Sequence, residues 1–283
     1  MRELTPESLR PLLLQRQNDS HKGNYGHLLL VCGSNRYSGA AVLATGAALK
    51  SGCGLVTLHS PARALQATVN KYPSAMLSED PGTCFSVVPE RLERFSAIAV
   101  GPGLGQAPET LAALESLLDA AQAAGIPMVL DADALNLIAN NARLLAKIPD
   151  GSVMTPHAGE LKRQIESIDP YEDEKPSAQD LSSLTGCVMV LKGYHSKILT
   201  PKGDVFENTT GNPGMAKGGS GDVLTGLIGG LLARGYSAAR AAAIGTWIHG
   251  YAGDCLSAEC TQEAYSSLDL IEVLHKGFKA LYQ

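Results

Sequence analysis

The chain alternates short apolar runs with longer segments that are amphipathic or rich in small residues. The apolar runs, which are too short for helices and predict buried strands, are 28–32, 54–60, 97–100, 128–130, 153–155 and 187–191. Helical patterns are found at 40–51, 107–124, 240–254 and 267–281, and a short helix is expected after Thr5, which precedes a proline. Two hairpin-like strands, 197–200 and 204–207, complete the pattern. It predicts one doubly wound α/β domain over residues 1–283, with a mainly parallel sheet flanked by helices on both faces.

Glycine-bearing or acidic segments come directly after the predicted strands. They are 33–40, 101–105, 131–136, 155–160 and 192–196. Because the carboxyl ends of parallel strands meet at one edge of a sheet, these segments are expected to converge where open α/β sheets bind ligands. For 101–105 alone, a tight turn explains the glycines equally well. The convergence of all five predicts an enzyme.

Two of these segments carry side chains suited to chemistry. Asp131, Asp133 and Asn136 follow a strand, and their side chains suit contacts to a metal ion or a hydroxyl group. The alternative is N-capping of the next helix, which would account well for one of the two aspartates but less well for both. His157 and Glu160 lie three residues apart at an expected helix start, so both can face one site. The alternative for His157 is a role in the core or as a cap. Its place after a strand favours function.

The chain is organised around the glycine-rich segment 212–226, which follows directly after Gly211. Glycines stand at 211, 214, 218, 219 and 221, and Asp222 precedes the apolar run 223–233. Glycines let backbone N–H groups approach an anion closely, and a helix start adds partial positive charge. The pattern therefore favours a phosphate-binding loop with Asp222 as a base beside the phosphoryl group. The alternative is a tight loop that closes helix packing, with Asp222 as an ordinary first-turn carboxylate.

Composition excludes several classes of protein. The 283 residues are 45% hydrophobic and 18% charged, and the formal net charge of −5 argues against a general nucleic-acid binder. Six scattered cysteines without a C-x-x-C motif indicate a reducing compartment and no zinc site. No signal-peptide pattern is found at the N-terminus, and charged residues interrupt the apolar stretches, so no membrane association is expected. A cytoplasmic location follows as the expectation.

Three further features receive structural interpretations. Trp247 and His249 are interpreted as packing residues within the helix at 240–254, because neither lies at the end of a strand. Residues 166–180 are charged, polar and contain proline, which predicts an excursion at the surface.

With these motifs identified, the chain resembles the ADP/ATP-dependent NAD(P)H-hydrate dehydratase family of the ribokinase-like superfamily. The matching blocks are Lys22-Gly23, Gly33-Ser-x-x-Tyr-x-Gly-Ala40, Gly101-Pro-Gly-Leu-Gly105, Asp131-Ala-Asp-Ala-Leu-Asn136, Thr155-Pro-His-Ala-Gly-Glu160, Lys192-Gly193 and Gly211-Asn212 through Gly218-Gly-Ser-Gly-Asp222. They run in family order over nearly the whole chain, which implies a ribokinase-like fold. Family members fused to an N-terminal epimerase domain are longer, so the chain is similar to the stand-alone dehydratase.

The resemblance implies a repair reaction. Its substrate is NADH hydrate or NADPH hydrate, in which water has added across a double bond of the nicotinamide ring. The family phosphorylates the ring hydroxyl from ADP or ATP with Mg²⁺, and phosphate then leaves more readily than hydroxide would. The resemblance also implies a homo-oligomer, with a tetramer as one form, and a functional link to an NAD(P)H-hydrate epimerase.

The resemblance assigns roles to individual residues. The contacts to the hydrated dinucleotide are Ala40, Gly103, His157 and Asp222, with Asp222 as the catalytic base. The contacts to the adenine nucleotide are Lys192, Gly193, Tyr194, His195, Ser196 and Gly221, and the amides of Gly218, Gly219, Ser220 and Gly221 hold the phosphoryl charge. Glu160 corresponds to a glutamate associated with Mg²⁺ in related kinases and is proposed to act through water.

Two positions depart from the family pattern, and two other functions remain as alternatives. Ser196 and Lys217 stand where threonines are expected. Ser196 keeps the hydroxyl, whereas Lys217 adds a cation beside the anion loop and can shift affinity or nucleotide preference.

A small-molecule kinase of the same fold, acting on a vitamin precursor or sugar alcohol, is the second candidate function. His157 argues against it, because such kinases more often have asparagine there. A nucleotide-sensing binding protein without chemistry is disfavoured by the intact Asp222.

Overall fold

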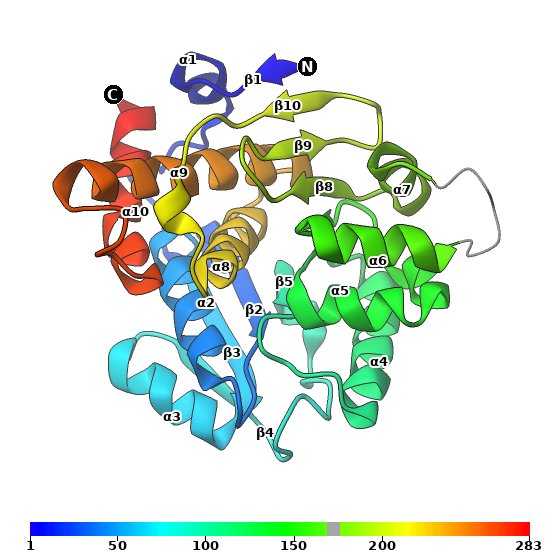
Figure 1. Ribbon diagram of the computed structural model, residues 1–283. Helices are drawn as coiled ribbons and strands as arrows, with labels where there is room; N and C mark the ends of the chain where they lie inside the picture. The colour runs from blue at the N-terminus through cyan, green and yellow to red at the C-terminus, as the bar shows by residue number, and fades with distance from the viewer. Residues whose placement is uncertain (169–175) are drawn as a thin grey trace.

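The computed structural model describes residues 1–168 and 176–283, whose strands form one ten-stranded sheet (Figure 1). In spatial order the strands are β1 (Arg2–Glu3), β10 (Val205–Glu207), β9 (Lys197–Leu199), β8 (Val188–Leu191), β7 (Val153–Met154), β6 (Met128–Leu130), β5 (Ala97–Val100), β2 (His27–Val31), β3 (Leu55–Pro61) and β4 (Met76–Asp80). Only β9, which pairs with β8 and β10, runs antiparallel to its neighbours among the described strands. The mainly parallel sheet and the predicted hairpin are confirmed.

Helices cover both faces of this sheet, as predicted. One face carries α2 (Ser38–Lys50), α3 (Ala62–Lys71), α8 (Ser220–Ala233), α9 (Ala238–Glu259) and α10 (Ser267–Tyr282), and the other carries α4 (Pro108–Ala124), α5 (Ala132–Ala139), α6 (Ala158–Ile168) and α7 (Ala178–Thr185) (Figure 1). Strand β2 shows why two layers are needed: Leu28 and Leu30 enter one core, whereas Leu29 enters the other. No helix in the described part of the chain is long and apolar enough to cross a membrane.

Some elements differ from the prediction. The sequence pattern does not predict β1, β4, α3 or α7, and α9 is longer than the expected 240–254. Strand β4 lies at the edge of the sheet, and most of it is exposed or half-buried, so it lacks the apolar signature of a buried strand. Of the predicted surface excursion at 166–180, residues 169–175 lie outside the described residues, while α6 and α7 occupy parts of its two ends. The short helix α1 (Pro6–Leu9) begins after Thr5, as expected.

Helix α8 is held by unusually close contacts on two sides. A Cβ atom on Gly226 would lie 2.0 Å from the carbonyl oxygen of Ala44 in α2, and one on Gly229 would lie 2.8 Å from the Cβ of Ala99 in β5. From Val223 to Ala233 the helix is entirely buried. Because its body cannot shift, the N-terminus of α8 is fixed at the carboxyl edge of the sheet.

Candidate active site

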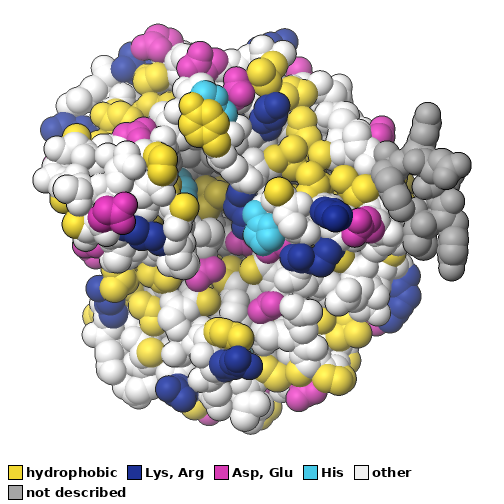
Figure 2. Space-filling model, in the orientation of Figure 1, with side chains coloured by type: hydrophobic (Ala, Val, Ile, Leu, Met, Phe, Trp, Pro, Cys, Tyr) yellow, Lys and Arg dark blue, Asp and Glu magenta, His cyan; other side chains and the backbone are white. Residues whose placement is uncertain are grey.

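A cavity of about 780 Å³ lies at the carboxyl ends of β6, β7 and β8, beside the N-terminus of α8. Figure 2 shows this face hollowed near its centre, with basic, acidic and histidine side chains around the hollow. The predicted site residues that line the cavity are His157, Glu160, Lys192, Gly193, Tyr194, His195, Ser196, Ser220, Gly221 and Asp222. The structure thus brings most of the predicted site residues, from three separate chain segments, into one cavity.

Four predicted residues do not line this cavity. Gly218 and Gly219 precede α8, where Gly219 adopts a left-handed conformation with φ of 89°. Ala40 and Gly103 contact each other instead, because a Cβ on Gly103 would lie 2.8 Å from the Cβ of Ala40. They connect the start of α2 with the loop after β5, outside the cavity.

Asp222 lies in the first turn of α8 and is half-buried. Its pKa is raised to about 6, mainly by burial and in part by the charge of Asp131, while Lys192 opposes both effects. An ordinary carboxylate in a first helical turn is stabilised in its charged form, so its pKa would be low. The raised pKa instead places Asp222 in the range suited to a general base at neutral pH.

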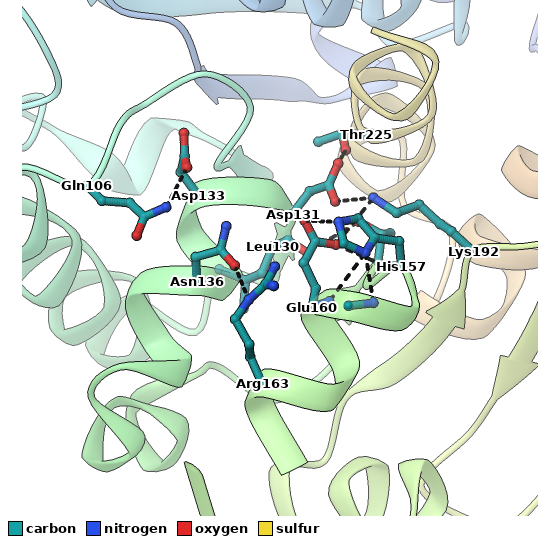
Figure 3. Close-up of polar contacts among 12 residues, drawn as sticks. Gln106, Leu130, Asp131, Asp133, Asn136, His157, Glu160, Arg163, Lys192 and Thr225 are labelled. Atoms are coloured by element: carbon teal, nitrogen blue, oxygen red, sulfur yellow. Dashed lines mark hydrogen bonds and ion pairs between the residues drawn. The ribbon is translucent and has the colours of Figure 1, made fainter. Parts of the chain in front are cut away.

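A buried ion pair connects two strand ends inside the cavity (Figure 3). Lys192, which follows β8, places its Nζ 2.6 Å from Oδ1 of Asp131 and 3.7 Å from Oε2 of Glu160. Asp131 Oδ2 accepts a hydrogen bond of 2.6 Å from Thr225 in α8. Burial alone would lower the pKa of Lys192, but Asp131 and Glu160 outweigh burial and raise it. The lysine is therefore a fixed positive charge facing the cavity.

The acidic segment after β6 does not cap the following helix, which was the alternative interpretation. Asp131 occupies the N-cap position of α5 without making a capping hydrogen bond. Asp133 accepts a hydrogen bond of 2.8 Å from the backbone N–H of Gly105 and so ties down the loop after β5. Asn136 accepts one from Arg163 at 2.9 Å (Figure 3). Hydrogen-bond contacts explain all three residues better than capping.

His157 and Glu160 face one another at the start of α6. The Nδ1 atom of His157 accepts hydrogen bonds from the backbone N–H groups of Gly159 and Glu160 at 3.0 and 3.3 Å, so the ring caps this helix. Glu160 Oε2 accepts from the backbone N–H of His157 at 2.8 Å, and Oε1 lies 3.4 Å from Nε2. Because Nδ1 accepts, Nε2 carries the proton of the neutral ring. His157 thus combines the capping role with a place in the cavity wall.

The start of α8 borders the cavity at Ser220, Gly221 and Asp222. A Cβ on Gly221 would lie 3.4 Å from Lys192 Nζ and 3.6 Å from Asp131 Oδ2. These are ordinary contact distances, so the Lys192–Asp131 ion pair lies directly beside the backbone of Gly221, next to Asp222. Backbone N–H groups at a helix start and an adjacent lysine form an arrangement that binds phosphate groups.

The cavity also contains residues that the sequence interpretation missed. His249 is buried, as expected of a packing residue, but it lines the cavity and its Nε2 lies 3.4 Å from Ser220 Oγ. Burial lowers its pKa to about 4, so the ring is neutral at physiological pH. Thr246 and Asn208 line the same region, and Thr246 Oγ1 is buried without a hydrogen-bond partner. Thr246 and His249 lie three residues apart on α9 and so share one face of that helix, but their spacing did not indicate that this face lines the cavity.

Two non-glycine residues of the cavity wall have left-handed backbone conformations. The φ angles are 48° at Ala132 and 54° at His195. Such strain costs free energy and tends to be retained at functional sites. The ring of Tyr194 stacks on the ring of His195 at a centroid distance of 4.0 Å, and Tyr194 is 88% exposed.

Among residues 1–168 and 176–283, no group of three or more His, Cys, Asp or Glu side chains is arranged to hold a metal ion.

Fold and cavity together define a ribokinase-like α/β protein with a cavity at the carboxyl edge of its sheet. At the level of the fold alone, this class is supported by a ribokinase from Arabidopsis thaliana, which superposes with a TM-score of 0.56 at 12% identity over 90% of this chain and 99% of its own. The model of the NAD(P)H-hydrate dehydratase family matches residues 28–276. The chain belongs to this family.

Individual relatives agree with this assignment. The ADP-dependent (S)-NAD(P)H-hydrate dehydratase of Neisseria meningitidis is 36% identical, over 85% of this chain and 80% of its own length. The bifunctional NAD(P)H-hydrate repair enzyme Nnr of Moorella thermoacetica is 39% identical over 96% of this chain, which spans only 53% of that relative. The ADP/ATP-dependent NAD(P)H-hydrate dehydratase of Bacillus subtilis, co-crystallised with ATP and Mg²⁺, superposes with a TM-score of 0.85 at 31% identity, covering 99% of this chain and 98% of its own.

Proposed function

We propose that this chain uses ADP or ATP to convert NADH hydrate or NADPH hydrate back to NADH or NADPH. Family membership supports the reaction class, and the raised pKa of Asp222 beside the Lys192–Asp131 pair is the observation that carries the mechanism. The relatives named ADP-dependent or ADP/ATP-dependent dehydratases support an adenine nucleotide as co-substrate. The cavity of about 780 Å³ has the size of a small-molecule site.

In the first step Asp222 takes the proton of the ring hydroxyl. The hydroxyl oxygen then forms a bond to the terminal phosphorus of the nucleotide, and the bond from that phosphorus to the bridging oxygen breaks, releasing AMP from ADP or ADP from ATP. Lys192 and the backbone N–H groups at the start of α8 stabilise the charge on the phosphoryl oxygens, with Gly221 in the cavity wall and Gly218 and Gly219 just before the helix. Loss of phosphate and of a ring proton then restores the double bond. The nucleotide is consumed because phosphate leaves far more easily than hydroxide.

The remaining site residues have binding roles in this proposal. Residues 192–196 line the cavity together and would contact the nucleotide, with the exposed ring of Tyr194 and its neighbour His195 at the mouth. His157 would contact the hydrated dinucleotide through the edge of its ring. Ala40 and Gly103, which touch each other outside the cavity, would hold a more distant part of the same dinucleotide.

The residues near Lys192 fit a magnesium ion held mainly by the nucleotide. Mg²⁺ prefers oxygen ligands, keeps several waters and often binds through one or two carboxylates and substrate phosphates. Glu160 faces the cavity, but its Oε2 already accepts a backbone hydrogen bond, so a contact through water fits better than a direct one. When bound, the ion would neutralise charge on the phosphates.

The wider setting is also part of the proposal. We place the protein in the cytoplasm, where adenine nucleotides and NAD(P)H are abundant, and we expect a single domain that forms a homo-oligomer. The bifunctional relatives are consistent with a functional link to an NAD(P)H-hydrate epimerase.

The direct test follows the absorbance of regenerated NADH and NADPH from their purified hydrates, with ADP and ATP in parallel and Mg²⁺ present. The proposal expects conversion with at least one nucleotide and release of one phosphate per NAD(P)H formed. Failure with both nucleotides, together with accumulation of a stable phosphorylated alcohol from another substrate, would establish the kinase alternative instead.

A further inference from the structure

Lys217 does not point its charge at the anion loop, although it was expected to add a cation there. Its Nζ donates hydrogen bonds to the backbone carbonyls of Gln262, Glu263 and Tyr265 at 2.9, 3.0 and 2.5 Å. It also lies 4.6 Å from the centre of the Tyr265 ring. A lysine ammonium has three N–H donors, and these three carbonyls use all of them. The ammonium is therefore committed to the connection between α9 and α10 (residues 260–266), although Lys217 also forms part of the cavity wall.

Tyr265 extends this connection to the other end of the glycine-rich segment. Its hydroxyl donates to Oδ1 of Asn212 at 2.7 Å, and the same oxygen accepts from the backbone N–H of Gly214 at 3.1 Å. Asn212 Nδ2 in turn donates to Asp254 of α9 at 3.1 Å. Tyr265 is only 3% exposed and is not part of the cavity wall, so it cannot touch a nucleotide in the cavity.

The segment from 211 to 219 leads directly into the proposed phosphate-binding loop, and the side chains of Asn212 and Lys217 make the polar contacts that hold it. Gly211 and Gly219 have φ angles of 104° and 89°. Glycine can adopt many other backbone conformations as well, so these two residues do not by themselves hold the segment in place. Ser267, at the start of α10, donates to the carbonyl of Gly218 at 2.8 Å. The α9–α10 connection and the first residue of α10 thus contact the segment from Asn212 to Gly218 without lining the cavity.

We propose that Lys217 and Tyr265 form a clamp that positions the backbone N–H groups of residues 218–221 for phosphoryl transfer. Lys217 acts as a positioning residue and not as a ligand of the nucleotide phosphates. Because those N–H groups act on the transferring phosphoryl group, their displacement slows the chemical step. A shift of about 1 Å in a catalytic group can cost about 100-fold in rate. The nucleotide is still held by residues 192–196, so its affinity changes little.

The test compares Lys217→Ala and Tyr265→Phe with Lys202→Ala, a control at an exposed lysine in the β9–β10 turn. The clamp predicts that Lys217→Ala lowers kcat by about tenfold or more, while the calorimetric Kd for ADP changes by less than about threefold. Tyr265→Phe shifts kcat in the same direction. Because Ala removes three carbons and the ammonium, n-propylammonium restores part of the lost kcat in Lys217→Ala, whereas 1-propanol does not.

The kinetic test rests on the proposed reaction. Amide hydrogen exchange tests the clamp without depending on that reaction. Amide hydrogen exchange in the peptide covering 211–221 should be about tenfold faster in both variants than in the wild type and in Lys202→Ala. Unchanged exchange in both variants would overturn the clamp, and so would a loss confined to ADP affinity with kcat preserved. If Lys217→Ala does not fold, Tyr265→Phe alone decides the outcome. If the wild type shows no turnover, the proposed function fails while exchange still tests the clamp.

Discussion

Lys192 and Asp131 meet at 2.6 Å although 61 residues separate them in the chain. The sheet brings them together, because Lys192 follows β8, Asp131 follows β6, and only β7 lies between these strands. Asp131 is almost completely buried and has a hydrogen bond to Thr225 on its other oxygen. The pair therefore places one fixed cation and one fixed anion near Asp222, and the two charges adjust in opposite directions the pKa that burial raises.

The first prediction concerns the pH dependence of turnover. Asp222 accepts a proton only when it is ionised, so kcat/KM should fall as pH drops through about 6, the value to which its pKa is raised. The charge of Asp131 contributes to that rise, so Asp131→Asn should move this acidic limb to lower pH. Asp133→Asn, a more distant change of the same kind, should move it less. If the acidic side of the kcat/KM profile stays at the same pH in Asp131→Asn, the charge of Asp131 does not raise the pKa of Asp222.

The second prediction concerns the nucleotide site. Lys192→Ala removes a cation that faces the cavity, so KM for ADP should rise by about tenfold, equivalent to about 1.4 kcal/mol of binding. Lys192 also lowers the pKa of Asp222, so the acidic limb should move to higher pH in this variant, opposite to its movement in Asp131→Asn. Lys202→Ala serves as the control. An unchanged KM for ADP would place Lys192 outside the nucleotide site.

Much of this site could be predicted from the sequence because its signals are local. Strand ends, glycines and acidic residues mark the loops after β5, β6, β7 and β8, and parallel topology brings such loops to one edge. The place of His249 in the cavity wall could not be predicted in this way, because its contact with Ser220 depends on how α9 packs against the start of α8. The direction of the Lys217 side chain likewise depends on the α9–α10 connection, which is 45 residues away at Gln262. Packing between distant helices leaves no such local signal.

The third prediction concerns the close contact between α2 and α8. In Gly226→Ala the new methyl group would lie 2.0 Å from the Ala44 carbonyl oxygen, so one backbone must move. We expect the free energy of unfolding to fall by about 3 kcal/mol or more in urea denaturation, at the upper end of overpacking effects. Gly39→Ala in α2 is the matched control, since no atom lies within 4 Å of its new methyl group. Equal stability of the two variants would contradict the close packing.

The fourth prediction links Asp222 to stability. Its pKa is about 6 in the folded protein against 3.8 for an unperturbed aspartate, so the folded state binds more protons between these values. Stability should therefore decrease as pH rises from about 4 to 6, and the cost is fully present above pH 6. Asp222→Asn removes that cost, so it should melt at a higher temperature than the wild type at about pH 8. This advantage should shrink as the pH falls toward 4. A lower melting temperature at pH 8 would indicate the ordinary first-turn role.

The most direct test of the mechanism is kcat of Asp222→Asn for NAD(P)H hydrate, measured with ADP affinity on the same preparation. Asparagine keeps the shape and a hydrogen bond but cannot accept the proton. The loop amides and Lys192 are unchanged, so ADP binding should persist. We expect kcat to fall by about 10²–10⁴, the range for loss of a positioned general base. Turnover close to that of the wild type, in a folded variant that binds ADP, would contradict the assignment of Asp222 as the base.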